Sequence, residues 1–332
     1  MRTIGYVAEV SGAFVSYRLL DTLASRLPGV WAILCRITLP ILLILAWRYW
    51  AGSAWQFRDA GVVRPSRSSR LEWLWLVCFQ SSCLLGTLLA IAHLRFYTML
   101  GFLEKARDHV NGYDAEYGPF VFALALSALI YFAWSGELLC RGLAQGLGTI
   151  RTNAAAGAVI SWLAFSALPV ALAQKLGYPL LPDAALWGLF ALFPGPICEA
   201  FYFRNHSLLP LIAARTVSTS LALAGIGFYL YWYPERSFST ALPLLGVCLT
   251  ALILISALWA GQLCHLWRTT FAMLRIGILR GILPGISIAA IIVADSHFKK
   301  ELHSLIICAA ALAAVGLIRG MRERATMCRC GW

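Results

Sequence analysis

The chain has 332 residues, of which 60% are hydrophobic and 13% are charged, and its mean hydropathy is +0.75. These values lie outside the range of ordinary soluble domains and predict an all-α, polytopic membrane protein. The formal net charge of +12 does not indicate a nucleic-acid-binding protein, because no basic stretch is long enough to form a binding domain.

The first 28 residues are predicted to form an amphipathic helix in the plane of the membrane, or a tail. They carry Arg2, Arg18 and Arg26 together with Glu9 and Asp21. They lack a compact apolar core followed by a small-residue cleavage site, so we expect no signal peptide.

Apolar runs long enough to cross the roughly 30 Å hydrocarbon core of a bilayer occupy most of the remaining chain. They predict about nine transmembrane helices, divided among an N-terminal segment (1–118), a central core (119–225) and a C-terminal segment with a basic tail (226–332). Pro169 and Pro284 lie inside two of the runs and predict kinks. The predicted spans are 29–47, 73–94, 119–136, 153–174, 180–200, 207–231, 241–263, 276–294 and 303–318.

Arginines between the spans predict how the chain is oriented. The loops predicted at 48–72 and 264–275 and the tail 319–332 are basic, and they fall on one side when nine spans are counted. The positive-inside rule makes that side cytoplasmic, together with the C-terminus, and places the mixed-charge loop 95–118 outside. We therefore expect a multi-pass protein of a bacterial cytoplasmic membrane whose arginines attract anionic lipids.

A charged octet, Ser135-Gly-Glu-Leu-Leu-Cys-Arg-Gly142, closes the third apolar run. Its carboxylate and guanidinium, Glu137 and Arg141, stand at i and i+4 and share one face of a helix. Charged groups inside a membrane are costly and need partners. We expect Glu137 to pair with Arg141, and we expect Arg215 to pair with Glu137 or Glu199.

Two more stretches follow the octet in order. Phe165 comes 24 residues after Arg141, and a later run reads Ser207-Leu-Leu-Pro210 before Arg215 and Thr219. Together the three stretches resemble the three motifs of the CPBP family, the intramembrane CAAX proteases and bacteriocin-processing enzymes. The resemblance covers roughly residues 119–225 and implies a helical membrane core.

The residues that carry out the family's chemistry are absent at the matching positions. In the family, the first Glu of motif one and the His of motif two activate a water, and the His and Asn of motif three stabilise the oxyanion. Here those four positions hold Gly136, Pro169, Arg215 and Thr219. Because neighbouring helical residues point about 100° apart, Glu137 does not replace the Glu missing at 136. The resemblance thus implies a vestigial site without catalytic residues, consisting of Gly136, Glu137, Arg141, Phe165, Pro169, Arg215 and Thr219.

A second alignment also fits the first motif. Glu199 and Arg204 match its acidic and basic ends, and Phe228 again follows the arginine by 24 residues, with Trp232 where the motif-two His would stand. It has no third motif, so the first alignment is preferred.

Metal and cofactor sites are not predicted. The ten cysteines show no C-x-x-C spacing, and none of the six histidines has a helical partner at i+4.

Three functions fit these observations. The first is a catalytically degenerate CPBP-like pseudoprotease, a membrane scaffold that holds another membrane protein or a membrane-bound peptide without cutting it. The second is an active intramembrane endopeptidase that uses Glu199 with His206 as relocated groups. The third is a transporter or lipid-handling protein in which Arg215 is a cation in the pathway.

Overall fold

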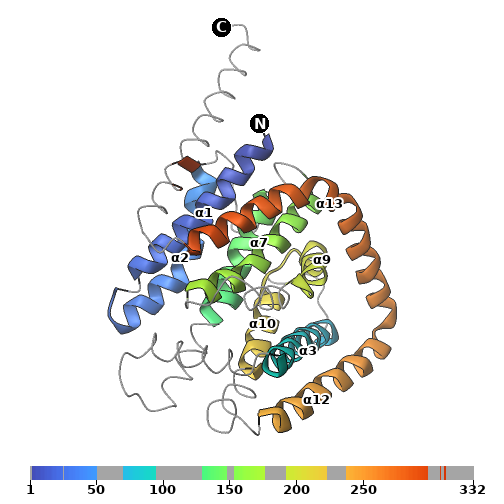
Figure 1. Cartoon of the computed structure of the whole chain (residues 1–332). Coiled ribbons are helices and arrows are strands. Elements are labelled where there is room, and N and C mark those ends of the chain that lie inside the picture. Colours follow the sequence, from blue (N-terminus) through green and yellow to red (C-terminus); the bar gives the residue numbers. More distant parts are fainter. Residues whose placement is uncertain are drawn as a thin grey trace.

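The computed structural model describes residues 2–24, 26–50, 70–94, 129–147, 153–175, 192–222, 237–297 and the positions 307, 310 and 311. Within these residues every regular element is helical and none is a strand, so the predicted all-α class is confirmed there (Figure 1). In chain order the elements are α1 (Arg2–Ala24), α2 (Gly29–Trp50), α3 (Arg70–Leu94), η2 (Leu129–Gly136), η3 (Leu138–Gln145), α7 (Ala154–Lys175), α9 (Gly195–Asn205), α10 (Leu209–Ala222), α12 (Ser237–Leu258) and α13 (Ala260–His297).

The pair α7 and α13 forms the most extensive interface between described helices, and α13 crosses α7 in Figure 1. Three glycines, Gly277, Gly281 and Gly285, stand four residues apart on α13 and face α7. A Cβ built at Gly281 would lie 2.7 Å from the carbonyl oxygen of Ala156, so a side chain there has no room. This G-x-x-x-G-x-x-x-G stripe therefore lets the two backbones approach closely, as in packed membrane helices.

The N-terminal segment forms the helix α1, as one of its two predicted alternatives states, and is not a tail; this helix is part of the buried core. Tyr6, Val10, Ala13, Phe14 and Tyr17 are all buried, and they recur at helical spacing on one face. The hydroxyl of Tyr6 donates a hydrogen bond of 2.6 Å to the carbonyl oxygen of Ala144 in η3. Because α1 also packs against α2 and α13, it closes one side of the bundle.

The segment 264–275, predicted as a basic loop, is wrong as a loop: it lies wholly inside α13. Leu263, Leu266, Thr270 and Met273 recur every three or four residues along it and are buried, so one face of the segment packs inward. The chain turns instead at Trp259, between α12 and α13.

The helices α3, α10 and α12 pack side by side in the lower part of Figure 1. The indole of Trp75 in α3 donates a hydrogen bond of 2.9 Å to the hydroxyl of Ser256 in α12. Its ring also stacks on Phe79 at a centroid distance of 5.1 Å. Buried hydrophobic residues from all these helices form one continuous core.

Residues 129–145 are π-helical on both sides of Glu137. π-Helical turns are rare and occur frequently at functional sites. This segment carries the charged octet. The rare π-helical geometry therefore occurs where the buried charges of Glu137 and Arg141 lie.

Two described helices are long and apolar enough to cross a membrane by length and composition: α7 over Ala154–Ala171 and α13 over Ala260–Asp295. Two shorter apolar helices lie at Val30–Ala46 and Leu242–Leu258. The count of nine spans remains a prediction. Outside the described residues lie the loop 95–118, most of the predicted spans 180–200 and 303–318, and the tail from 319.

Candidate functional site

Four segments bring four charged side chains together at the centre of the bundle. Glu137 joins η2 to η3, Arg141 lies in η3, Glu199 in α9 and Arg215 in α10. We call these four residues the charge cluster. Arg141 pairs with Glu137 through Nη1 and Oε2, and its Nε lies 3.1 Å from Oε1 of Glu199. Arg215 Nε lies 3.6 Å from Oε1 of Glu137.

Phe165 and Ser161 of α7 complete the surroundings of the charge cluster. The guanidinium carbons of Arg141 and Arg215 lie 5.0 and 4.7 Å from the centroid of the Phe165 ring. Both distances are within the range of cation–π attraction. The hydroxyl of Ser161 donates a hydrogen bond of 3.0 Å to Oε1 of Glu199. Thus α7 supplies an aromatic face for the cations and a donor for one carboxylate.

The charge cluster is neutral overall and sealed from solvent. Two carboxylates oppose two guanidiniums, and their side chains are between 0% and 2% exposed. Removing such charges from water costs several kcal/mol for each ion, which only close pairing offsets. Each carboxylate is held by at least one guanidinium, so neither is available as a free general base.

Two sequence predictions about pairing are confirmed. Glu137 and Arg141 pair across one helical turn, and the partner of Arg215 is Glu137. The charged side chains are packed against one another and do not line an open space. The reason is mutual neutralisation, which removes the need for solvent around either sign of charge.

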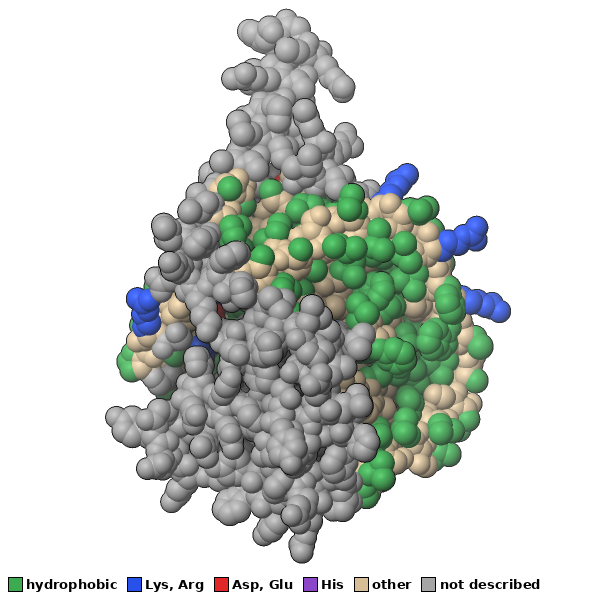
Figure 2. Space-filling view, viewed as in Figure 1, with side chains coloured by type: hydrophobic (Ala, Val, Ile, Leu, Met, Phe, Trp, Pro, Cys, Tyr) green, Lys and Arg blue, Asp and Glu red, His purple; other side chains and the backbone are tan. Residues whose placement is uncertain are grey.

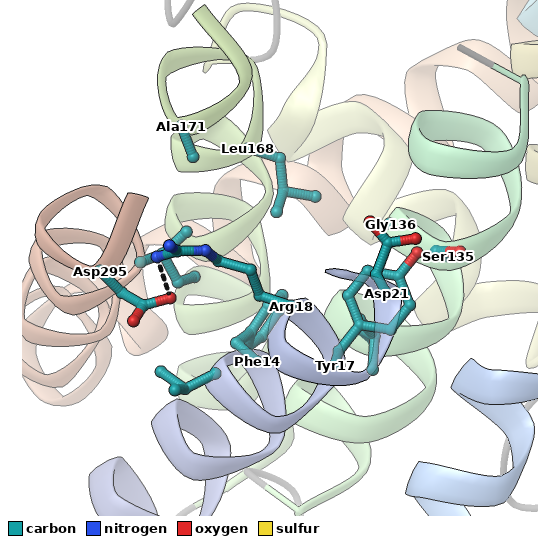
Figure 3. Close-up of a pocket in the computed structure, with 12 residues that line it drawn as sticks. Phe14, Tyr17, Arg18, Asp21, Ser135, Gly136, Leu168, Ala171 and Asp295 are labelled. Carbon is teal, nitrogen blue, oxygen red and sulfur yellow. Dashed lines mark ion pairs between the residues drawn. The ribbon is translucent and has the colours of Figure 1, made fainter. Parts of the chain in front are cut away.

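Gly136 lies apart from the charge cluster, on a second feature of the bundle. With Ser135 it lines a cavity of about 40 Å³ between α1, η2, α7 and α13, which also contains the ion pair of Arg18 and Asp295 (Figure 3). This volume holds only a few water molecules. The cavity lining includes Gly136 and leaves out Glu137, as their angular separation on the helix predicts.

Of the other vestigial-site residues, Pro169 is buried within α7, and Thr219 is buried one turn after Arg215 in α10. Neither residue is among the ion-pair or hydrogen-bond partners of the charge cluster, so their side chains contribute to packing around it.

Comparisons with known proteins add no relative: no protein-family model, curated protein or solved structure matches the chain.

The alternative pair, Glu199 and His206, occupies two different environments. Glu199 is fully buried in the charge cluster. His206 is exposed just after the end of α9, in a left-handed conformation with φ of 49°. Its ring packs beside Phe203 at a centroid distance of 6.3 Å. The helix α9 ends at Asn205, and this end separates the two groups.

Glu199 and Arg204, which match the two ends of motif one in the second alignment, have different partners in the structure. Nη2 of Arg204 lies 2.6 Å from Oε1 of Glu72 in α3, and its guanidinium lies over the ring of Trp259. Glu72 is buried, so this contact ties α9 to α3 beside the turn into α13.

Sequence reasoning missed the glycine stripe of α13 and the role of Ser161 as a donor to Glu199. The stripe has a readable signal, since Gly277, Gly281 and Gly285 form a G-x-x-x-G pattern in an apolar helix. The Ser161 contact has no such signal, because 38 residues separate the two partners. Within the described residues no group of three or more His, Cys, Asp or Glu is placed to hold a metal ion.

Proposed function

We propose that the chain is an integral membrane protein whose central helices are a catalytically degenerate version of the CPBP core. In this proposal it acts as a scaffold that holds another membrane protein or a membrane-bound peptide. The observation that carries the proposal is the charge cluster. Its members Arg141 and Arg215 both lie against the ring of Phe165, so each of the three stretches that resemble the family motifs contributes one of these residues.

The chemistry of the charge cluster supports a structural role over hydrolysis. A peptidase of this type needs a base that can reach a water and donors that face a developing oxyanion. Glu137 and Glu199 are buried and neutralised by Arg141 and Arg215, and the ring of Phe165 covers both guanidiniums. The charges therefore hold these segments in register, and neither carboxylate of the charge cluster is exposed.

The outer surface supports placement in a membrane. Leu258 of α12 and Leu279 and Leu283 of α13 are 77%, 87% and 74% exposed. Figure 2 shows hydrophobic side chains spread over one continuous face of the molecule. A water-soluble monomer rarely exposes an apolar face of this extent. Hydrocarbon chains of lipids would cover it without cost.

The test compares Glu137→Gln and Arg141→Ala with Arg280→Gln, which removes an exposed arginine of α13. Both buried substitutions should lower the yield of folded protein in membranes, because each leaves an uncompensated buried charge. The exposed control should leave the yield unchanged. Peptidase assays on a membrane-bound, prenylated peptide should give no turnover that depends on Glu137. Turnover by the wild type that is lost in Glu137→Gln, at equal protein level, would overturn the scaffold proposal.

A further inference from the structure

The helix α13 is too long to be a simple transmembrane span. It has 38 residues, which corresponds to about 57 Å at 1.5 Å per residue, whereas the hydrocarbon core is about 30 Å thick. The 20 residues from Ile276 to Asp295 alone account for about 30 Å. Figure 1 also shows α13 bending before it crosses α7, so if the second part crosses the hydrocarbon core, the first part, Ala260–Arg275, leaves that direction and is free to lie at the membrane surface.

The face of α13 that carries Arg268 and Arg275 has no further arginine after Arg275; the next exposed arginine, Arg280, points about 140° away from it. At 100° per residue, Arg268 and Arg275 point within about 20° of each other, on the side opposite the buried Leu266 and Thr270. After Arg275 the same outward face continues with exposed apolar residues such as Leu279 and Ile286. The change from basic to apolar on one face marks the level at which the helix enters the bilayer.

The two arginines are available to an external anion. Both are exposed, and neither has an ion pair with any described residue. The sequence contains no Asp or Glu from Ala260 to Ala294, so the helix itself offers no local partner. Exposed aromatic residues, Trp267 and Phe271, lie beside them, as is common where a helix meets the membrane surface. Figure 2 shows Lys or Arg side chains projecting at the edge of the hydrophobic face.

We propose that Arg268 and Arg275 form a binding surface for the phosphate groups of anionic phospholipids at the start of the membrane-spanning part of α13. The two side chains stand seven residues apart, about 10 Å along the helix, which is comparable to the depth of a headgroup layer. The two guanidiniums attract the negative phosphate groups, and no acidic residue of α13 near them competes for this contact. The flanking residues Trp267 and Phe271 are suited to the interface between headgroups and hydrocarbon. This inference rests on the membrane placement proposed above but not on the scaffold role.

The experiment reconstitutes the full chain into phosphatidylcholine bilayers that contain trace spin-labelled phosphatidylglycerol or phosphatidylcholine. The measured quantity is the ratio of the two association constants. For the wild type the ratio should exceed one and should fall as salt is raised. Each arginine favours an anionic leaflet by up to about fivefold, so Arg268→Gln/Arg275→Gln should bring the ratio toward one. Arg268→Lys/Arg275→Lys keeps the charge and should preserve selectivity.

The outcomes separate the possible failures. A wild-type ratio of one, or a ratio unchanged in the double glutamine variant, overturns the lipid site while leaving the scaffold proposal intact. Failure of the wild type to incorporate into phosphatidylcholine bilayers overturns the membrane placement itself. Binding of a labelled DNA duplex by the detergent-solubilised chain, lost in the same glutamine variant, would assign the surface to nucleic acid and would also overturn the inference.

Discussion

The buried charge of Glu199 is compensated by only a few contacts. Its Oε1 receives the hydroxyl of Ser161 at 3.0 Å and faces Nε of Arg141 at 3.1 Å, and the side chain is fully buried. No water can replace either contact without opening the core. The energetic consequence of changing this residue is therefore set by charge balance more than by size.

Glu199→Gln keeps the shape of the side chain but leaves the charge cluster with two cations and one anion. We expect it to destabilise the folded protein by about 3 to 5 kcal/mol, because a buried charge loses its partner. Adding Arg141→Met should recover part of that loss, since the pair is then removed together. Unfolding midpoints in mild detergent measure both effects. Equal midpoints for wild type and Glu199→Gln would show that Glu199 is already uncharged.

A substitution at His206, in contrast to one at Glu199, is expected to leave the protein as stable as before or more stable. Its φ of 49° is a left-handed conformation, which costs a residue with a Cβ roughly 1 to 2 kcal/mol and costs glycine almost nothing. His206→Gly should therefore leave stability unchanged or raise it, while the β-branched His206→Val should lower it. Membrane yield and unfolding midpoint are the readouts. Loss of a peptidase activity in His206→Gly at full stability would instead support a catalytic histidine.

Among the helices, α13 depends on contact with α7 through its glycine stripe. Gly281→Leu would place a side chain against the Ala156 backbone, which cannot move as a flexible side chain can. We expect a loss of about 1 to 3 kcal/mol. Gly246 in α12 has nothing within 4 Å of a built Cβ, so Gly246→Leu is the matched control and should be neutral. Similar unfolding midpoints for the two variants would contradict this close packing.

At the scale of the elements, the sequence predicts the positions of several helices, but it does not predict which helices are buried or how far α13 extends. Periodic apolar runs located α2, α3, α7 and α12, because hydrophobicity and length are local properties. They did not reveal that 264–275 continues α13, since arginines on an exposed helical face look the same as arginines in a loop. The burial of α1 was also hidden, because charges such as Arg18 and Asp21 find partners, Asp295 and Arg36, only in the folded bundle.

The candidate site follows the same rule. The pair Glu137–Arg141 could be predicted because its partners are four residues apart. For Arg215 the sequence limited the possible partners to Glu137 and Glu199, because a buried cation requires an anion, and the structure shows Glu137. The approach of Arg141 to Glu199, and of both guanidiniums to Phe165, depends on how four segments pack and has no local signature.

For the whole molecule, the distribution of arginines predicts the orientation in the membrane. Three segments are basic: the tail from Arg319 to Trp332, the segment 48–72 and the first part of α13. Each arginine near an anionic leaflet contributes about 1 kcal/mol, so together they should outweigh Arg2, Arg18 and Arg26 at the other end. A reporter that fluoresces only in the cytoplasm, fused after Trp332, should be bright. A dark fusion made at normal level would reverse the assigned sidedness.

The order of the four charges of the charge cluster along the chain also determines when each ion pair can form during synthesis. Glu137 and Arg141 leave the ribosome together, whereas Arg215 follows Glu137 by 78 residues. At about 5 to 20 residues per second, the first pair waits roughly 4 to 16 seconds for the last cation. The first pair is neutral by itself, and the two later residues, Glu199 and Arg215, carry one charge of each sign. The contacts of Arg141 with Glu199 and of Arg215 with Glu137 can therefore form only after translation has passed α9 and α10.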